Sequence, residues 1–245
     1  MISTRIVGAA WETFIDFLLP RLCCDCGQRV HQSQWLICET CLDAIPPLTE
    51  PICSTCGYPD AHLTGEGKCR DCPKGTVWFQ SIRTATTFES TPKLLVEKLK
   101  YHNRIEYAHL LALAMARAHQ TAKSPAPQII IPVPLHKVRQ RERGFNQSAL
   151  LANHLTGLLG APCQPRAITR IRPTPTQTRL KKRDRQRNVK GAFQCPKPHL
   201  IQDQHVLLVD DVCTTGSTLN ECARILIQAG AHSVQCLTYA RAKLG

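Results

Sequence analysis

Fold class follows most directly from the run Val206-Leu207-Leu208-Val209-Asp210-Asp211-Val212-Cys213-Thr214-Thr215-Gly216-Ser217-Thr218. Its four leading apolar residues predict a buried strand that brings two adjacent carboxylates to its carboxyl end. A turn of small hydroxyl residues follows, and the next helix is predicted from Ser217 to Ala229, ended by Gly230. Backbone N–H groups in such a turn, together with the helix N-terminus, form an anion site suited to a phosphate monoester.

The two acids, Asp210 and Asp211, would repel a bare phosphate, so they must face another group. Ribose hydroxyls, held directly or through Mg²⁺, meet this requirement, because carboxylates accept hydrogen bonds and magnesium prefers oxygen ligands shared with phosphates. We therefore expect a ligand that carries both a ribose and a phosphate. A turn with only a structural role is the alternative. A Walker-type loop is excluded by the missing Lys, and the glycine fingerprint of a dinucleotide fold is absent.

Outward from this run, helices and strands alternate over residues 77–245. Helices are predicted over 91–100, 105–120 and 146–159, and further strands over 129–131 and 233–239. This order predicts an α/β fold with a parallel sheet covered by helices on both faces. Ligands of such sheets bind at the carboxyl ends of the strands.

Positive charge is concentrated in one part of this domain. Lys and Arg outnumber Asp and Glu by 31 to 18, and residues 137–190 contain fourteen basic side chains against Glu142 and Asp184. The surplus indicates a local polyanion site, for a pyrophosphate or a nucleic-acid backbone, with a solvated loop as the alternative. Pro134 follows a predicted strand and precedes a basic loop with Arg139 and Arg143, as a pyrophosphate-binding loop would.

The segment 23–76 is rich in cysteine and poor in bulky aliphatic residues. Two residues between cysteines let both thiolates reach one ion, and two such pairs complete the tetrahedral shell of zinc. Eight cysteines therefore predict two structural zinc ions in a double zinc ribbon, with sequential pairing favoured over an interleaved one. A redox role is disfavoured, because a redox motif normally occurs once. The pairs are Cys23 with Cys26, Cys38 with Cys41, Cys53 with Cys56, and Cys69 with Cys72.

Residues 1–22 predict a short amphipathic helix, with apolar side chains at helical spacing from Trp11 to Leu19 and Pro20 as its end. No apolar run reaches the ~18 residues needed to cross a bilayer. Acids interrupt this segment where a signal peptide would need an apolar centre. A cytoplasmic protein without a membrane span is expected, and cytosolic thiols stay reduced and able to bind metal.

The run 206–218 resembles the motif of type I phosphoribosyltransferases at every position. The resemblance implies 5-phosphoribosyl pyrophosphate (PRPP), or a closely related ribose 5-phosphate compound, as the ligand. The resemblance implies that Asp210 and Asp211 hold the ribose 2′ and 3′ hydroxyls. It implies that the 5′-phosphate is bound by the loop residues Thr214, Thr215, Gly216, Ser217 and Thr218. In that family a mobile loop before the motif strand closes over the diphosphate. The segment 178–190 resembles this loop and would bring cations to the departing diphosphate, namely Lys181, Lys182 and Arg183.

The order of motifs along nearly the whole chain is similar to the ComF family of competence proteins, especially its DNA utilization branch. The motifs are the double zinc ribbon, a Pro-Val-Pro strand end, Arg143-Gly144-Phe145-Asn146-Gln147-Ser148, Thr176-Gln177 with Arg187-Asn188, and the phosphoribosyltransferase run. The resemblance implies a role in handling imported DNA, with DNA-uptake or recombination proteins as partners.

Two functions remain open. One is a phosphoribosyltransferase with Mg²⁺ and an unidentified acceptor. The other is a non-catalytic module that binds single-stranded DNA through its zinc ribbons and basic surface and keeps the phosphoribosyl site as a sensor. Binding of this second kind depends steeply on salt. The aromatic content of 5% argues mildly against extensive base stacking.

Overall fold

The structure is a computed structural model that describes residues 20–30, 36–60, 62–69, 72, 76–122, 124–173 and 188–243. The predicted N-terminal helix therefore lies outside the described residues. The chain divides into two compact units, Met1–Pro46 and Pro47–Gly245. This division falls earlier than the change of composition near residue 76, because the second group of paired cysteines is part of the unit that contains the sheet.

The larger unit is built around a four-stranded parallel sheet with the strand order β1-β6-β5-β2. Its strands are β1 (Ile82–Thr87), β2 (Ile129–Pro132), β5 (His205–Cys213) and β6 (Ser233–Arg241). β2 and the first part of β5 consist almost entirely of buried aliphatic residues, as is typical of a sheet covered on both faces. A separate antiparallel pair is formed by β3 (Thr169–Arg170) and β4 (Phe193–Gln194).

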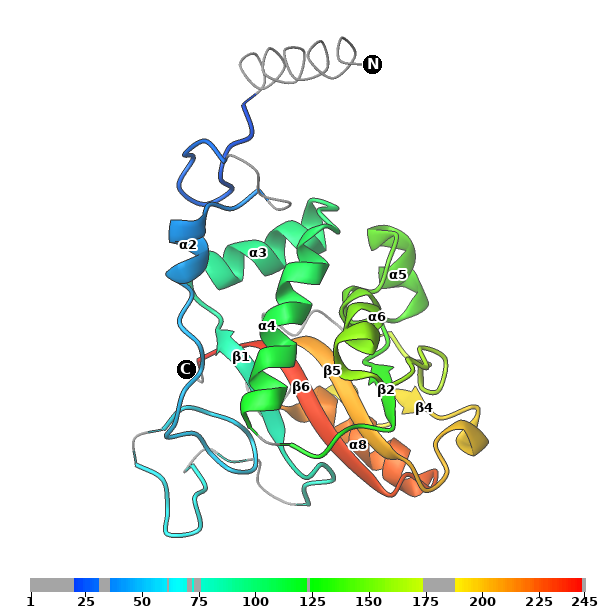
Figure 1. The fold of residues 1–245 in the computed structure, drawn as a ribbon. Helices are drawn as coiled ribbons and strands as arrows, with labels where there is room; N and C mark the ends of the chain where they lie inside the picture. Colours follow the sequence, from blue (N-terminus) through cyan, green and yellow to red (C-terminus); the bar gives the residue numbers. More distant parts are fainter. Residues whose placement is uncertain are drawn as a thin grey trace, which may run out of the picture. The chain divides into compact units, whose positions relative to one another are not determined.

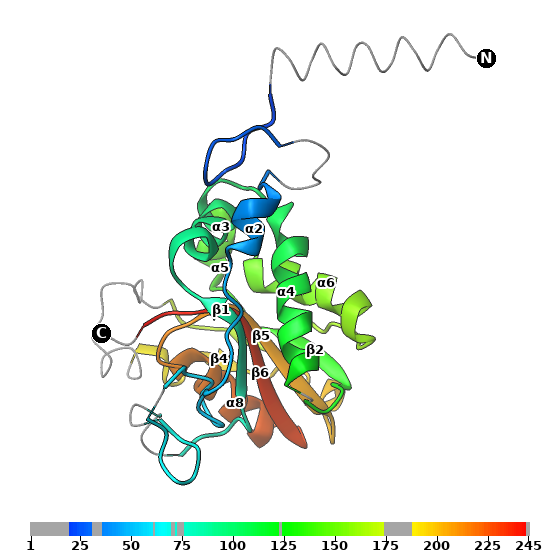
Figure 2. The same cartoon turned by 60° about the vertical axis from the view of Figure 1, so that its left-hand side comes forward.

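Helices cover both faces of the parallel sheet (Figure 1). α4 (Tyr107–Thr121) contacts β1 and β6, and α6 (Gln147–Leu159) contacts β2 and β5. α8 (Ser217–Gln228) contacts β5 and β6 on the opposite face, and the turned view in Figure 2 again places α4 and α8 on opposite sides of the strands. The predicted fold class is confirmed.

Four shorter or connecting helices complete the description. They are α2 (Glu39–Asp43), which belongs to the smaller unit, α3 (Ser90–Tyr101), α5 (Lys137–Arg143) and the 3-10 helix η2 (Pro198–Leu200). Among the described residues, none of the helices combines the length and apolar character that a bilayer span requires.

Local capping explains why α6 begins and ends where the sequence predicts. Asn146 Oδ1 accepts the Ser148 N–H at 3.0 Å, which satisfies a donor at the open N-terminus of the helix. Gly160 follows the helix in the left-handed conformation, with φ of 72°. Asn146 Nδ2 also donates to Val133 O at 3.0 Å, so the cap ties the start of α6 to the segment after β2.

Three local predictions need correction. The strand that carries the acids does not end at residue 209, because Asp210 pairs with Thr238 and Cys213 with Arg241 in β6. Residues 137–143 form the helix α5 instead of a loop, since their Lys, Arg, Gln and Glu residues favour helix and His136 Nδ1 accepts the Val138 N–H. The strand β1 was not predicted, because its threonine-rich sequence carries little apolar pattern of its own.

Candidate functional site

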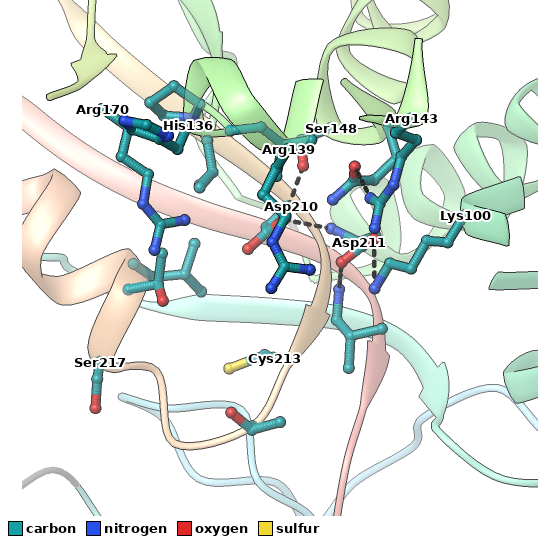
Figure 3. A pocket seen from close by; sticks show the side chains of 18 of the residues that line it. Lys100, His136, Arg139, Arg143, Ser148, Arg170, Asp210, Asp211, Cys213 and Ser217 are labelled. Carbon is teal, nitrogen blue, oxygen red and sulfur yellow. Dashed lines mark hydrogen bonds and ion pairs between the residues drawn. The ribbon is translucent and has the colours of Figure 1, made fainter. Parts of the chain in front are cut away.

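A cavity of about 420 Å³ opens at the carboxyl ends of the parallel strands. The segments after β1 and β2, the end of β5 and the first turn of α8 all contribute to its lining. In Figure 3, Asp210 and Asp211 lie between the basic side chains Arg139, Arg143 and Lys100. Ligands of open α/β sheets bind at this edge, so the cavity is the candidate site.

Asp210 is held from two sides. Ser148 Oγ, at the start of α6, donates to Asp210 Oδ1 at 2.8 Å, and the Asp211 backbone N–H donates to the same oxygen at 2.9 Å. Burial, followed by the negative charge of Asp211, raises the pKa of Asp210 to about 7. The carboxyl therefore changes its charge close to neutral pH, where a bound cation or a hydroxyl donor would favour the ionised form.

Asp211 is buried and carries its own counter-charge. Lys100 Nζ lies 2.7 Å from Asp211 Oδ2, and Asp211 Oδ1 accepts the Val212 N–H at 2.7 Å. Lys100 belongs to the last turn of α3, where a cation also interacts favourably with the helix dipole. A carboxylate this buried would be costly without a partner, so the ion pair fixes the charge and the orientation of Asp211.

The turn between β5 and α8 has the geometry of an anion-binding loop. Gly216 adopts a left-handed conformation, with φ of 75°, at the N-cap of α8, and the first turn of this helix contains no acid. Its N–H groups therefore present partial positive charge toward the cavity. Thr214, Gly216, Ser217 and Thr218 line the cavity, whereas Thr215 does not. The Thr215 hydroxyl lies 2.8 Å from Ser217 Oγ and so supports the turn from within.

Basic side chains outnumber acidic ones among the lining residues by four to two, with Lys100, Arg139, Arg143 and Arg170 on the basic side. The Arg143 guanidinium lies 5.5 Å from the ring centroid of Tyr101 and donates to Gln147 Oε1. Arg170 lies 5.4 Å from the ring centroid of Phe193, and burial lowers its pKa. Such preorganised cations suit a ligand that carries more negative charge than one phosphate.

The structure brings most of the predicted ligand-binding residues to this one cavity. They are Asp210, Asp211, Thr214, Gly216, Ser217, Thr218, Pro134, Arg139 and Arg143. Thr215 is the exception, and Lys181, Lys182 and Arg183 lie outside the described residues.

Sequence reasoning missed several side chains of the cavity, among them Ser148, Lys100 and Arg170. Ser148 belongs to the motif Arg143–Ser148, but nothing in the local sequence indicated that its hydroxyl would reach Asp210. Lys100 and Arg170 carry no local signal, because their places in the cavity depend on how distant elements pack.

The eight paired cysteines form two clusters, Cys23, Cys26, Cys38 and Cys41 in one and Cys53, Cys56, Cys69 and Cys72 in the other. The four sulfurs of each cluster lie within 4.8 Å of one another, for example Cys26 and Cys38 at 3.6 Å. Zn–S bonds of about 2.3 Å in a tetrahedron require S–S distances of about 3.8 Å. Both clusters therefore fit a zinc site with four thiolate ligands, and their grouping is the sequential one, not the interleaved one.

Two family models match the chain. A double zinc ribbon domain matches residues 14–73, and a phosphoribosyl transferase domain matches residues 146–243. The first match covers both cysteine clusters. The second covers α6, the acid pair and the loop that leads into α8.

Similar full-length relatives carry the same two parts of the chain in one alignment. DNA utilization protein YhgH of Salmonella typhi is 37% identical over 222 residues, which is 89% of this chain and 95% of that protein. Competence protein F of Haemophilus influenzae is 32% identical over 225 residues, which is 90% of this chain and 96% of that protein. Competence protein ComFC of Bacillus subtilis is 27% identical over 213 residues, with 84% of each chain covered. The chain belongs to the ComF family of DNA utilization and competence proteins, which join a double zinc ribbon to a phosphoribosyltransferase domain.

Proposed function

We propose that the cavity binds PRPP, or a closely related ribose 5-phosphate compound, together with Mg²⁺. The observation that carries the proposal is the position of two carboxylates and an anion-binding loop on the same wall of one cavity. Within the described residues no hydrogen bond reaches Asp210 Oδ2, while Ser148 and the Asp211 N–H occupy Oδ1. Asp210 Oδ2 is therefore the oxygen that accepts a ribose hydroxyl.

Different residues of the cavity are proposed to bind different parts of the ligand. The N–H groups and hydroxyls of Thr214–Thr218 bind the 5′-phosphate, and the ion pair with Lys100 orients Asp211 beside the ribose. Arg139 and Arg143 bind the diphosphate from the side of α5. Mg²⁺, when bound, would neutralise part of the diphosphate charge. Asp210 Oδ2 would then reach the ribose hydroxyl directly or through this ion, which prefers oxygen ligands.

We further propose that this arrangement supports phosphoribosyl transfer. The bond between ribose C1 and diphosphate breaks while C1 bonds to an acceptor nucleophile. Fixed cations stabilise the charge that develops on the departing diphosphate. Lys181, Lys182 and Arg183 are proposed as further cations that stabilise the departing diphosphate.

The relatives named for DNA utilization and competence support a role for this chain in the use of imported DNA. We assign it to the cytoplasm, with DNA-uptake or recombination proteins as candidate partners. All fourteen cysteines lie among the described residues, and none of them forms a disulfide there, which fits a reducing compartment.

Calorimetric titration of PRPP with Mg²⁺ tests the binding proposal. Asp210→Asn and Asp211→Asn should each weaken binding by about tenfold to a hundredfold, because a hydrogen bond to a charged acceptor contributes about 1.5–3 kcal/mol. Asp203→Asn is the matched control, since Asp203 is exposed and its left-handed φ of 56° suits Asn equally well. Equal affinity of all three variants and the wild type would remove the proposal.

Transfer is tested separately from binding. Labelled PRPP is incubated with a panel of bases, nucleosides and DNA fragments, and the release of diphosphate is compared with that of the Asp210→Asn protein. Acceptor-dependent release is expected for the wild type only. Binding without any release above that of the variant would leave a ligand sensor and refute the transferase.

One observation favours a second function, binding of single-stranded DNA. The basic helix α5 presents an exposed face beside the cavity, and its segment belongs to the stretch 137–190 that holds most of the net positive charge. Affinity for an oligonucleotide should then fall steeply with salt. Flat salt dependence, or unchanged binding by a variant lacking Lys181, Lys182 and Arg183, would exclude this function.

A further inference from the structure

The second cysteine cluster lies against the strand that supports the phosphate loop. The Ile82 N–H donates to Thr55 O at 2.9 Å, so the knuckle Cys53–Tyr58 is hydrogen-bonded to the start of β1. Gly57 follows Cys56 with φ of 63°, and a Cβ added to it would lie 2.3 Å from Ile82 O. The knuckle can approach β1 this closely only because residue 57 has no side chain.

Ile82 in turn contacts the loop. Its Cδ1 would lie 3.3 Å from a Cβ added to Gly216, the residue that caps α8 and lines the cavity. Ile82 is fully buried. It therefore lies between two glycines, Gly57 of the knuckle and Gly216 of the phosphate loop, and a shift of the knuckle is transmitted through a closely packed side chain.

A second set of contacts connects the same two regions. The Arg241 guanidinium lies 5.5 Å from the ring centroid of Tyr58, and its Nη1 donates to Cys213 Sγ at 2.6 Å. Cys213 is the last residue of β5, and its O accepts the Ala242 N–H at 2.9 Å. Arg241 thus connects the ring of Tyr58, two residues after Cys56, with Cys213, the residue that precedes the phosphate loop.

The charge of Arg241 requires an explanation. Arg241 is only 3% exposed. Within the described part of the chain its Nε has no hydrogen-bond partner and no acid pairs with its guanidinium. A buried cation is costly without a nearby anion. Zinc held by four thiolates carries a net negative charge, so a metal-loaded second cluster supplies that anion.

We propose that the second cysteine cluster supports the phosphate-binding loop through Ile82, and that Arg241 is a positioning residue between the zinc knuckle and the loop. The inference rests on the proposed phosphoribosyl function. In this arrangement the loop holds its anion-binding geometry only while the knuckle stays folded around its metal. No such role is proposed for the first cluster.

Two glycines give a matched test. Gly27 follows Cys26 as Gly57 follows Cys56, and Gly27 also has a left-handed φ of 73°. A Cβ added to Gly27, however, meets no atom of the described residues within 4 Å. Gly57→Ala and Gly27→Ala therefore carry similar backbone strain and keep all eight cysteines, and only Gly57→Ala pushes a knuckle away from Ile82. Zinc content, hydrogen exchange of the amides in 213–217 and PRPP affinity are measured for both full-length proteins.

Gly57→Ala should speed up amide exchange in the loop and lower PRPP affinity by about tenfold. Loss of a residue that supports a ligand-binding group typically weakens binding by about tenfold to a hundredfold, and we expect the lower value here. Gly27→Ala should leave both unchanged. The exchange of α4 amides reports whether the sheet unit stays folded. Equal loop exchange in the two variants would overturn the proposal.

Arg241→Met provides a second variant in case Gly57→Ala does not fold. It keeps both cysteine clusters and should loosen the loop while zinc content stays at two ions per chain. Unchanged loop exchange in this protein would contradict the positioning role. Hydrogen exchange needs no ligand, so the two proposals can fail separately. If the wild type binds no PRPP but the variant still shows faster loop exchange, the proposed function is refuted and the support of the loop by the knuckle is retained.

Discussion

The two cysteine clusters have the same ligands and almost the same spacing, yet they have different surroundings. In the first cluster only Cys23 is buried and Cys26 is exposed. In the second, Cys53, Cys56 and Cys69 are buried, and Tyr58 and Leu63 pack against them. The second also belongs to the compact unit that contains the sheet. Equal metal chemistry therefore need not mean equal importance for the fold or for the cavity.

The difference shows how a small metal site becomes part of a larger domain. A zinc knuckle provides its own tight turn, so it folds without a large apolar core. The knuckle Cys53–Tyr58 additionally presents a glycine and a tyrosine to β1 and β6. We infer that these two residues, and not the cysteines, distinguish a supporting cluster from an independent one.

The largest effect is expected when one ligand is removed from each cluster in turn. Cys53→Ser should destabilise the unit Pro47–Gly245 by at least about 3 kcal/mol, because loss of a metal is among the most disruptive single changes. In a unit of this size that loss corresponds to roughly 6–12 °C in melting temperature. Cys38→Ser should leave that transition in place. Thermal unfolding followed by near-ultraviolet circular dichroism distinguishes the two.

This comparison has a direct control in zinc content. Elemental analysis should find two ions in the wild type and one in each variant. If Cys38→Ser lowered the melting temperature of the sheet unit as much as Cys53→Ser, the two clusters would be energetically equivalent and the comparison would fail.

An intermediate effect is expected in the rate of metal loss. An exposed ligand can exchange with a chelator directly, whereas a buried cluster must first open locally. Zinc should therefore leave in two phases, with the first cluster about tenfold or more faster, as measured by the absorbance of a metal-sensitive dye. Cys38→Ser should abolish the fast phase and keep the slow one. If Cys38→Ser abolished the slow phase instead, the fast phase would belong to the second cluster and the slow phase to the first.

The smallest effect is expected from pH, which acts on the cavity through Asp210. Because burial and the charge of Asp211 raise the pKa of Asp210 to about 7, this carboxyl is mostly neutral at pH 6 and mostly ionised at pH 8. Affinity for PRPP with Mg²⁺ should rise over this range by less than about tenfold, since only the ionised form attracts a cation.

The change of stability with pH has the opposite sign to the change of PRPP affinity with pH. A raised carboxyl pKa stabilises the fold at low pH, and this contribution is lost as pH rises through about 7. Asp210→Asn should flatten the pH dependence of both affinity and stability. In Gly57→Ala the pH dependence of affinity should persist at a lower overall affinity. A steep pH dependence that remains in Asp210→Asn would assign it to another group.

Much of the fold and part of the site could be predicted because their causes are local. Two residues between cysteines bring two thiolates to one ion whatever the rest of the chain does. Asn146 and Gly160 bound α6 through contacts within one turn of chain. The run 206–218 likewise contains its strand, its acids and its loop within thirteen residues.

The tertiary structure alone decided which distant groups complete the site. Lys100 meets Asp211, Ser148 meets Asp210, and Arg241 lies between Tyr58 and Cys213. Each contact joins elements far apart in sequence, so it depends on how the sheet orders its strands and on where each helix packs. Spacing along the chain contains no information of that kind. The same reason explains why the sequence predicted two equivalent zinc clusters and only the packing of Gly57 on Ile82 distinguished them.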